Sequence, residues 1–305
     1  MKRFRLLLAA LVLVVVACPV SSPTDPPPTG TTVPTGDWVV SPSGGDDTDN
    51  LVAAVQAHPR VLINAPLKVD KIAAFGSVSD RVITFSGSGA LVRTAVNNPT
   101  GDLVTFPVMQ FIGGSNVTLV NPQIQGPGGV CNVPRPGGGV FRAYYDSRYE
   151  ESSGVELNGV QNFTIQGGNI HDVKGDGVRI FYNYKVSPSQ PSRNVTISDL
   201  TTNCTGRAGV TNVSSDQVVV NKGRYDNAGL WVFNVEPFNA LTVTNYTINQ
   251  PTVGYSSSSW LFVGGLYFRC TPVAVANIHV NGPVFLGLHM DRSVISCAVP
   301  QVTVA

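Results

Sequence analysis

The chain has few charged residues and few of the runs that build long helices. Lys, Arg, Asp and Glu make up 13% of the 305 residues, and the net charge is +1. Such a balance gives no basis for binding a nucleic acid or an anionic membrane surface electrostatically, so we expect no nucleic-acid partner. The chain beyond its N-terminal segment is instead rich in Val, Thr, Asn, Gly and Ser. This composition favours an all-β fold.

Cysteine is also scarce, and no CxxC pair or Cys/His spacing typical of zinc is present, so we expect no metal site of this kind. Apart from Cys18, the cysteines are Cys131, Cys204, Cys270 and Cys297. In an oxidising compartment four cysteines allow two disulfides, with three possible connectivities. Cys270 and Cys297 lie about one repeat apart, which makes them the preferred pair.

The first residues have the composition of a targeting segment. A basic start is followed by an apolar run over residues 6–17, which is short for a transmembrane helix. The run ends in Val-Val-Ala-Cys at residues 15–18, which resembles a bacterial lipobox. The resemblance implies that Cys18 is acylated and anchors the mature protein to a membrane. Ordinary secretion with cleavage nearby is the alternative, and both export the chain.

Residues 19–36 form a segment rich in Pro, Thr and Ser. Such a composition cannot pack a core and behaves as a semi-extended spacer. We therefore expect three parts: a signal peptide with lipobox over residues 1–18, this tether, and one domain over residues 37–305. The predicted location is extracytoplasmic, as a surface or periplasmic lipoprotein, with a secreted or virion-associated protein as the alternative.

A four-residue pattern of glycine, apolar, variable and apolar residues recurs along this domain. It begins at Gly154, Gly177, Gly209, Gly229, Gly265 and Gly287. The steps between successive copies are 23, 32, 20, 36 and 22 residues. A period near 22 with insertions is typical of a solenoid, in which each repeat buries its apolar face only against its neighbours.

Two further strands per repeat can be placed after the glycine pattern. The second begins at Asn116, Asn162, Asn194, Gln217, Ala240 and Asn277, and the third is short, as in residues 168–170. Three strands per coil, stacked about 4.8 Å apart, predict a parallel β-helix. Asn-X-Ser/Thr sequons fall mostly on these coils, and we interpret them as turn asparagines rather than glycosylation sites.

Residues 45–57 read GDDTDNLVAAVQA, and RVLINAPLKV follows at residues 60–69. The apolar spacing predicts a short amphipathic helix with Thr48 or Asp49 as its N-cap. The acidic loop, helix and extended coil resemble the N-terminal cap of the pectate lyase superfamily of right-handed parallel β-helices. This resemblance is close over residues 45–95 and elsewhere rests on the coil pattern. It implies a right-handed parallel β-helix with a capping helix, in which the acidic loop is structural.

Gly175 and Asp176 resemble the GDD corner of the polygalacturonase family of glycoside hydrolases, with Asp176 at the first aspartate. The second aspartate is replaced by Gly177, and the His-Gly and Arg-X-Lys elements of that family have no counterparts here. The family mechanism therefore cannot be transferred, and only Asp176 matches by position.

Strand alternation turns the third residue of each glycine pattern toward solvent. The predicted outward column is Gln110, Glu156, Arg179, Thr211, Trp231, Tyr267 and His289, and a second column adds Phe233, Arg269 and Asp291. Aromatic rings among hydrogen-bonding groups suit a sugar-binding surface. The predicted substrate contacts are Arg179, Trp231, Tyr267, His289, Phe233 and Arg269. An ordinary solvated face or a protein interface is the alternative.

Carboxylates near this column are candidates for glycoside cleavage. Glu156 lies one coil before Arg179, and Asp176 directly precedes the strand of Arg179, which fits the carboxyl separations of about 5 to 9.5 Å in glycosidases. A structural Glu156–Arg179 pair is the alternative. Asp172 is a weaker catalytic candidate, as are Asp226, Glu236 and Asp291.

A lyase would instead need Ca²⁺ and a basic residue such as Lys174, Arg179 or Arg207, and no acidic cluster of sufficient density is visible. No other cofactor is expected. His171 and His289 are single histidines that we assign to turns or the surface.

Insertions at residues 127–153, 181–193 and 249–264 are predicted to form walls beside the glycine-strand face. The aromatic and charged residues 141–151 either clamp a glycan, pack on a coil or join a second protomer. We therefore expect a protein that binds an extracellular polysaccharide, with cleavage by Glu156 and Asp176 as the sharper hypothesis. A non-catalytic adhesin or a phage-type structural protein is the alternative, and the strand edge at the C-terminus is compatible with a homo-oligomer.

Overall fold

A computed structural model describes residues 36–94, 106–134, 138–237, 241–263, 275–286, 293–295 and 302–304. The chain divides after Val33, and the fold described here is that of the second unit, Pro34–Ala305. Some predicted positions lie outside the described residues. They are Cys18, Tyr267, Arg269, Cys270, His289, Asp291 and Cys297.

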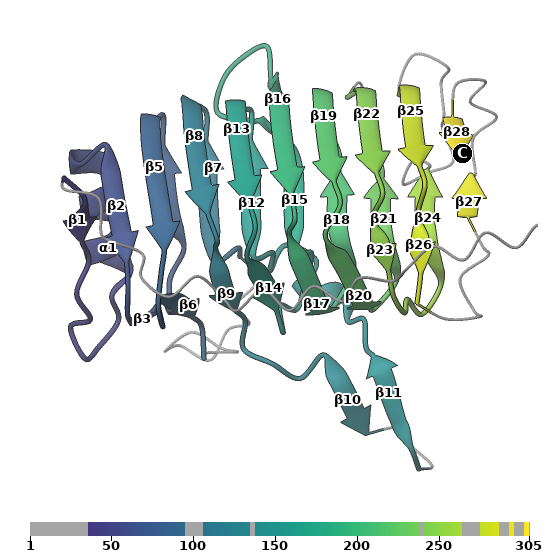
Figure 1. Cartoon of the computed structure of the whole chain (residues 1–305), viewed down its shortest axis with the longest axis horizontal. Helices are drawn as coiled ribbons and strands as arrows, with labels where there is room; N and C mark the ends of the chain where they lie inside the picture. The colour runs from purple at the N-terminus through teal and green to yellow at the C-terminus, as the bar shows by residue number, and fades with distance from the viewer. Residues whose placement is uncertain are drawn as a thin grey trace, which may run out of the picture. The chain divides into compact units, whose positions relative to one another are not determined.

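The second unit is a right-handed parallel β-helix, as predicted, in which each coil contributes a strand to each of three faces (Figure 1). Face 1 contains β4 (Ala73–Gly76), β7 (Met109–Ile112), β12 (Val155–Asn158), β15 (Val178–Asn183), β18 (Ala208–Asn212), β21 (Trp231–Val235), β24 (Ser259–Val263) and β27 (Ser293–Ile295). Strands of successive coils pair in parallel along this face, for example β12 with β7 and with β15.

Faces 2 and 3 are built in the same way. Face 2 contains β1 (Trp38–Val39), β2 (Arg60–Ile63), β5 (Ser79–Phe85), β8 (Ser115–Val120), β13 (Gln161–Gln166), β16 (Gln190–Ser198), β19 (Ser215–Asn221), β22 (Val243–Asn249), β25 (Val275–Asn281) and β28 (Val302–Val304). Face 3 contains β3 (Pro66–Lys68), β6 (Ala90–Val92), β9 (Gln123–Gln125), β14 (Asn169–His171), β17 (Thr201–Thr205), β20 (Arg224–Ala228), β23 (Thr252–Val253) and β26 (Val284–Phe285).

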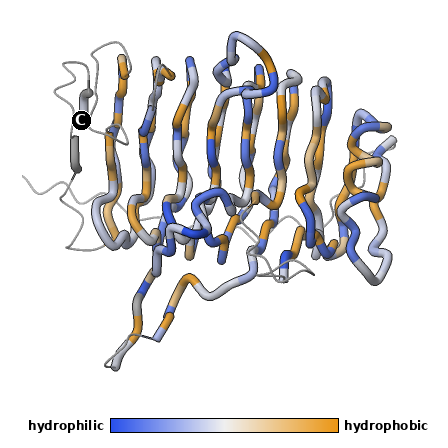
Figure 2. The backbone as a smooth tube through the Cα atoms, turned by 180° about the vertical axis from the view of Figure 1, so that it is seen from behind, coloured by the Kyte–Doolittle hydropathy of each residue, from blue (hydrophilic) through white to orange (hydrophobic). Residues whose placement is uncertain are grey.

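The core consists of the inward side chains, stacked from coil to coil. Apolar and polar residues alternate along the strands, as the hydropathy colouring shows (Figure 2). The rings of Phe75, Phe111 and Phe163 follow one another at centroid distances of 4.8 Å. Phe233, which we predicted to point to solvent, belongs to this core and is fully buried, because it pairs with the inward Val210.

The glycine pattern marks face 1 correctly at Gly154, Gly177 and Gly209 but is wrong in phase at Gly229. A Cβ on Gly177 would lie 2.5 Å from the Gly209 carbonyl oxygen, so the close approach of adjacent coils requires glycine. Gly229 serves a different position, a corner where a Cβ would lie 1.9 Å from the Gly206 carbonyl oxygen. The strand after Gly229 is β21, but its register pairs Val210 with Phe233, so the predicted phase is wrong there. The predicted copies at Gly265 and Gly287 lie outside the described residues.

Face 2 carries a ladder of exposed asparagine side chains where its strands bend. Asn116, Asn162 and Asn194 have φ of 56°, 53° and 52°, a left-handed conformation that asparagine tolerates well. The Asn162 amide donates to Asn116 at 3.0 Å, and the Asn194 amide donates to Asn162 at 2.9 Å. This geometry matches our interpretation of turn asparagines. The pairing of β22 with β19 places Asn245 opposite Gln217, the fourth copy. The fifth copy is therefore Asn245 and not the predicted Ala240.

The helix α1 (Thr48–Ala57) packs Leu51, Ala54 and Val55 against the first coils, so it caps the core as predicted. Its N-cap is Asp47, not Thr48 or Asp49. The Asp47 carboxylate instead accepts backbone hydrogen bonds from Ser43 at 2.6 Å and Lys68 at 3.1 Å.

The neighbouring Asp46 carboxylate serves the same cap. Burial acts to raise the pKa of Asp46, but hydrogen bonds from Thr48 and the Asp70 backbone outweigh it and lower the pKa. The acidic loop therefore joins the helix to the first coil. Within the described residues, no helix combines the length and apolarity needed to cross a membrane.

Candidate functional site

Two insertions border face 1 at its two corners. The first contains a hairpin of β10 (Cys131–Pro134) and β11 (Val140–Ala143), which extends away from the coils (Figure 1), and returns to β12 through residues 144–153, here called the strap. The second insertion extends β15 and β16 as an antiparallel pair through Tyr182 and Asn183. The insertions predicted at residues 127–153 and 181–193 therefore adjoin face 1, whereas the segment predicted as a third insertion, residues 249–264, contains the coil strands β23 and β24.

The strap, which contains the 3₁₀ turn η1 (Ser147–Tyr149), packs closely on the corner before β15. The Gly175 amide donates to the Ser152 carbonyl at 2.9 Å, and a Cβ on Gly175 would lie 2.8 Å from the Glu150 carbonyl oxygen. Tyr149 is buried, with the Lys174 ammonium 5.0 Å from its ring centroid. The aromatic and charged loop therefore packs on the coils of its own chain, one of the three alternatives that we considered.

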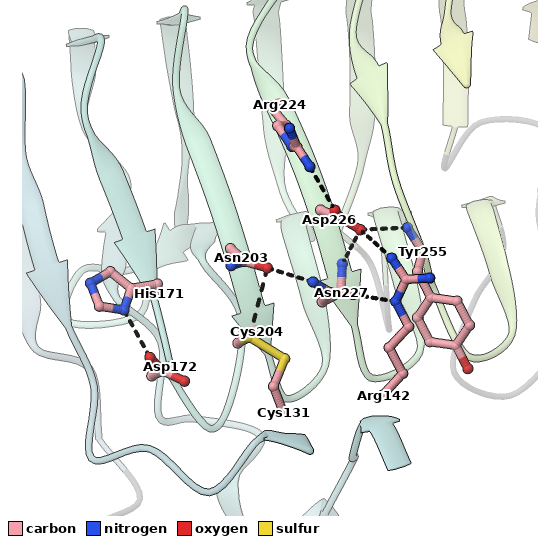
Figure 3. Close-up of a disulfide and its surroundings, with 10 residues drawn as sticks. All are labelled: Cys131, Arg142, His171, Asp172, Asn203, Cys204, Arg224, Asp226, Asn227 and Tyr255. Atoms are coloured by element: carbon pink, nitrogen blue, oxygen red, sulfur yellow. Dashed lines mark hydrogen bonds and ion pairs between the residues drawn. A yellow bond between two sulfur atoms is a disulfide. The ribbon is translucent and has the colours of Figure 1, made fainter. Parts of the chain in front are cut away.

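A disulfide between Cys131 and Cys204 fastens the hairpin to face 3 (Figure 3). The predicted pair of Cys270 and Cys297 lies outside the described residues. Close to the disulfide, Arg142 donates to the Asn227 side chain at 2.8 Å and stacks over the Tyr255 ring at 4.8 Å.

Asp226, one of the weaker carboxylate candidates, lies among the residues that attach the hairpin to face 3. Its carboxylate accepts from the backbone amides of Asn227 and Tyr255 at 2.8 and 2.6 Å (Figure 3). The Asp226 carboxylate thus holds the corner that carries the hairpin.

Glu156 occupies the outward column of face 1, and three residues hold its carboxylate. The amides of Gln110 and Asn158 each donate to its Oε1 at 2.8 Å, and Arg179 Nη1 lies 3.4 Å from its Oε2. Arg179 also donates to Glu151 of the strap. Glu156, Asn158 and Arg179 are all buried, so this group lies beneath the strap rather than in open solvent.

A second group of the same kind lies further along face 1. Arg207 donates to Glu236, and the Asn234 amide donates to the same carboxylate at 2.9 Å. The other arm of Arg207 contacts Asp176 Oδ2 at 3.1 Å, while its Nε lies 3.8 Å from Glu150 of the strap. Burial acts to lower the pKa of Arg207, but the carboxylates of Asp176, Glu236 and Glu150 raise it overall, so Arg207 is a cation.

Asp176 is fully buried between the two groups. Its Oδ1 accepts from the Ala208 backbone amide at 3.1 Å. Burial raises the pKa of Asp176, and the opposing effects of Arg207, Arg179 and Thr211 do not cancel it. Burial and the neighbouring Glu150 likewise raise the pKa of Tyr145, whose hydroxyl donates to Glu150. The site therefore places one buried carboxyl with a raised pKa among several other carboxyl groups.

The two main catalytic candidates thus join one cluster, in which Arg179 contacts Glu156 and lies within electrostatic reach of Asp176. Asp172 lies elsewhere. It follows β14 with a left-handed φ of 57°, and its carboxylate contacts the His171 ring at 2.8 Å (Figure 3).

The aromatic residues of face 1 are only partly those predicted. Trp231, predicted in the outward column, instead pairs with Ala208 and lies outside the column of Glu156, Arg179 and Thr211. It is half-buried and stacks on Phe262 at a centroid distance of 4.7 Å. The true outward column continues from Thr211 to Asn234 and Phe262. Phe181, also half-buried, lies under the Arg179 guanidinium at 4.5 Å.

Sequence reasoning missed Asn158, Asn234 and Phe262, and it singled out Glu150 and Glu151 only as part of the segment 141–151. One signal was available: a Glu and an Asn two residues apart occur at residues 156–158 and, in reverse order, at 234–236. In the described part of the chain, His, Cys, Asp and Glu form no group of three or more that could hold a metal ion.

No known protein family matches the chain, and no curated protein does. Among solved structures, it is similar to a 1,3-alpha-1,4-beta-D-galactose-4-sulfate-3,6-anhydro-D-galactose-2-sulfate 4 galactohydrolase, with a TM-score of 0.57, 14% identity and 83% of this chain covered. It is also similar to the catalytic unit of a GH87 alpha-1,3-glucanase from Streptomyces thermodiastaticus, with a TM-score of 0.54, 11% identity and 84% covered.

A third similar structure is an iota-carrageenase complexed to iota-carrageenan fragments, with a TM-score of 0.51, 13% identity and 83% of this chain covered. The matches span 57%, 48% and 57% of the three neighbours' own chains, so this chain corresponds to about half of each. At these identities the likeness is one of fold.

Proposed function

We propose that the protein is an exported carbohydrate-binding protein that engages an extended polysaccharide on face 1, between the strap and the insertion of residues 181–193. The observation that carries this proposal is the concentration of arginine, glutamate and asparagine side chains on that face beside the half-buried rings of Phe181, Trp231 and Phe262. Such rings stack on pyranose faces while polar groups reach hydroxyls. The likeness in fold to polysaccharide hydrolases supports the same class of ligand.

Cleavage of the bound chain is the second candidate function. Burial raises the pKa of Asp176, as a general acid of a glycosidase requires, and Glu156 is the partner carboxylate. The ion pairs of Glu150 and Glu151 with Arg207 and Arg179 lie over this pair. Cleavage therefore requires the strap to move. A role as an adhesin or a phage-type structural protein does not require this movement.

A polysaccharide panel tests both functions. Retention of the protein on immobilised polymers measures binding, and reducing ends or unsaturated products measure cleavage. Hydrolysis is expected to be lost in Glu156→Gln and in Asp176→Asn, but kept in Asp172→Asn, whose carboxylate lies outside the cluster. Hydrolysis that persists in both of the first two variants would rule out the assigned pair. Retention without products would leave a binding protein, and unsaturated products that chelation abolishes would indicate a Ca²⁺-dependent lyase.

Export and anchoring are tested separately. The proposal places the protein outside the cytoplasm, held by a lipid on Cys18. Incorporation of a labelled fatty acid in the intact chain, and its loss in Cys18→Ser, are the expected results. Secretion of an unlabelled protein would instead support a cleaved signal peptide.

A further inference from the structure

The cluster on face 1 contains two triads of the same composition. The first is Glu156, Asn158 and Arg179, and the second is Glu236, Asn234 and Arg207. In each triad the asparagine amide donates to a carboxylate two residues away, at 2.8 and 2.9 Å, and an arginine from the neighbouring coil contacts that carboxylate. The same polar unit therefore occurs twice along the stack.

Each triad leaves one hydrogen-bond donor and one acceptor unpaired. The donors are Nε of Arg179 and of Arg207, and the acceptors are Oδ1 of Asn158 and of Asn234. None of these four atoms has a hydrogen-bond partner among the described residues, although the four residues are all buried. Buried polar atoms of this kind are costly unless a water or a ligand pairs with them.

The charge of the cluster selects against an anionic ligand. Five carboxyl groups, from Glu150, Glu151, Glu156, Asp176 and Glu236, surround the two guanidinium groups of the triads. The balance is negative even when Asp176 keeps its proton, and both guanidinium groups are already paired. A sulfate or uronate would meet repulsion without gaining a free cation.

A hydroxyl group has the opposite property, because it donates and accepts at once. We propose that each triad becomes a subsite for a hydroxyl group of an uncharged sugar residue when the strap moves aside, and that the polysaccharide held on face 1 is neutral. This inference rests on the proposed function and adds the ligand class and its contacts. The asparagines lie on β12 and β21, three strand spacings or roughly 14 Å apart, so a chain that touches both runs along the stack of coils.

The test compares each neutral polymer with its own sulfated derivative. Galactan, glucan, mannan and xylan, unmodified and chemically sulfated, are titrated into the full-length protein by calorimetry at low and high salt. We expect at least one neutral polymer to bind roughly tenfold more tightly than its sulfated form, with little salt dependence. A sulfated form that binds more tightly and weakens steeply with salt would overturn the inference while leaving the proposed function intact.

Variants then test the triads themselves. Asn158→Ala and Asn234→Ala are each expected to weaken binding of the neutral polymer about fivefold, the loss of roughly one hydrogen bond. Asn281→Ala makes the same chemical change on face 2, where Asn281 donates to Asn249 at 2.8 Å, and should bind like the parent. If an alanine variant fails to fold, Asn158→Ser and Asn234→Ser keep an acceptor and should keep part of the affinity.

The outcomes separate the two proposals. Neutral binding that is unchanged in both folded asparagine variants would show that the triads are not the subsites. Failure of all eight polymers to bind would overturn the proposed function together with this inference.

Discussion

The two sides of face 1 are both buried, but by different means. On the inner side Val155, Leu157 and Val178 contact residues one coil away, and the stack closes with any apolar side chains of suitable volume. On the outer side Glu156 and Arg179 need partners with a defined direction, and one of these, Glu151, comes from the strap. Stacking of coils therefore suffices for the inner side, whereas the outer side depends on the path of one loop.

The largest effect should come from the inner side. Phe111→Ala removes a fully buried ring of face 1 that lies 4.8 Å from Phe75, and should lower the free energy of unfolding by about 3–5 kcal/mol. Urea denaturation measures it, with Val140→Ala on the exposed hairpin strand as a control that should change little. A loss below about 1 kcal/mol would mean that the stack refills the space.

On the outer side, Arg207→Ala leaves Asp176 and Glu236 buried without their cation. It should cost about 3–5 kcal/mol, at the lower end because Arg207 retains 7% side-chain exposure. The triple replacement of Arg207 by Met and of Asp176 and Glu236 by Leu should recover most of this loss in the same assay. If the free energy of unfolding does not recover, apolar packing cannot stabilise the outer side of face 1 as it does the inner side.

The disulfide is expected to matter next. Cys131 and Cys204 are 73 residues apart, and their replacement by alanine should lower stability by about 2–4 kcal/mol. Hydrogen exchange should rise first in the hairpin and strap, and only later in the coils. If hydrogen exchange rises equally in the coils, the hairpin and strap do not unfold independently of the coils.

The asparagine ladder should contribute less. Asn162→Ala places alanine at a φ of 53° and removes two ladder hydrogen bonds, of 3.0 and 2.9 Å, for a loss of about 1–2 kcal/mol. Asn162→Gly keeps the backbone conformation and loses only the ladder contact, so it should be milder. Thermal denaturation of the two variants separates these terms, and equal losses would assign the effect to the side chain alone.

The smallest effect is a pH dependence from Asp176. Because its folded pKa is raised above 3.8, the folded protein binds more protons than the unfolded chain as the pH rises past that value. The stability of the parent relative to Asp176→Asn should therefore fall with rising pH, until the folded carboxyl also ionises. Unfolding measured across acidic to neutral pH gives this difference, and a constant difference would contradict the raised pKa.

The fold could be predicted from sequence wherever one glycine position was repeated. Gly154, Gly177 and Gly209 mark the same close approach of coils, and this local pattern predicted the strands of face 1. The prediction failed at Gly229 because a corner also requires glycine, and sequence spacing cannot distinguish the two positions. That shift of phase placed Phe233 on the wrong side.

The site was predictable only in part, for a related reason. The structural pair of Glu156 and Arg179, one of our two alternatives, follows from strand register and is present in the structure. The contacts of Glu150 and Glu151 depend on where a long insertion returns across the corners. Its anchor at Cys204 lies far away in sequence, so no local pattern predicts it.

The bonds that attach the hairpin to face 3 also determine how the β-helix would respond to a pulling force. Most coils touch only their neighbours, whereas Cys131–Cys204 and Arg142–Asn227 join residues 73 and 85 positions apart. Coils outside this span can unfold one at a time. The coils between β12 and β21 are joined by these long-range bonds and should unfold together. Pulled from its ends, the domain would unwind in small steps from each side and retain a central block that gives way last.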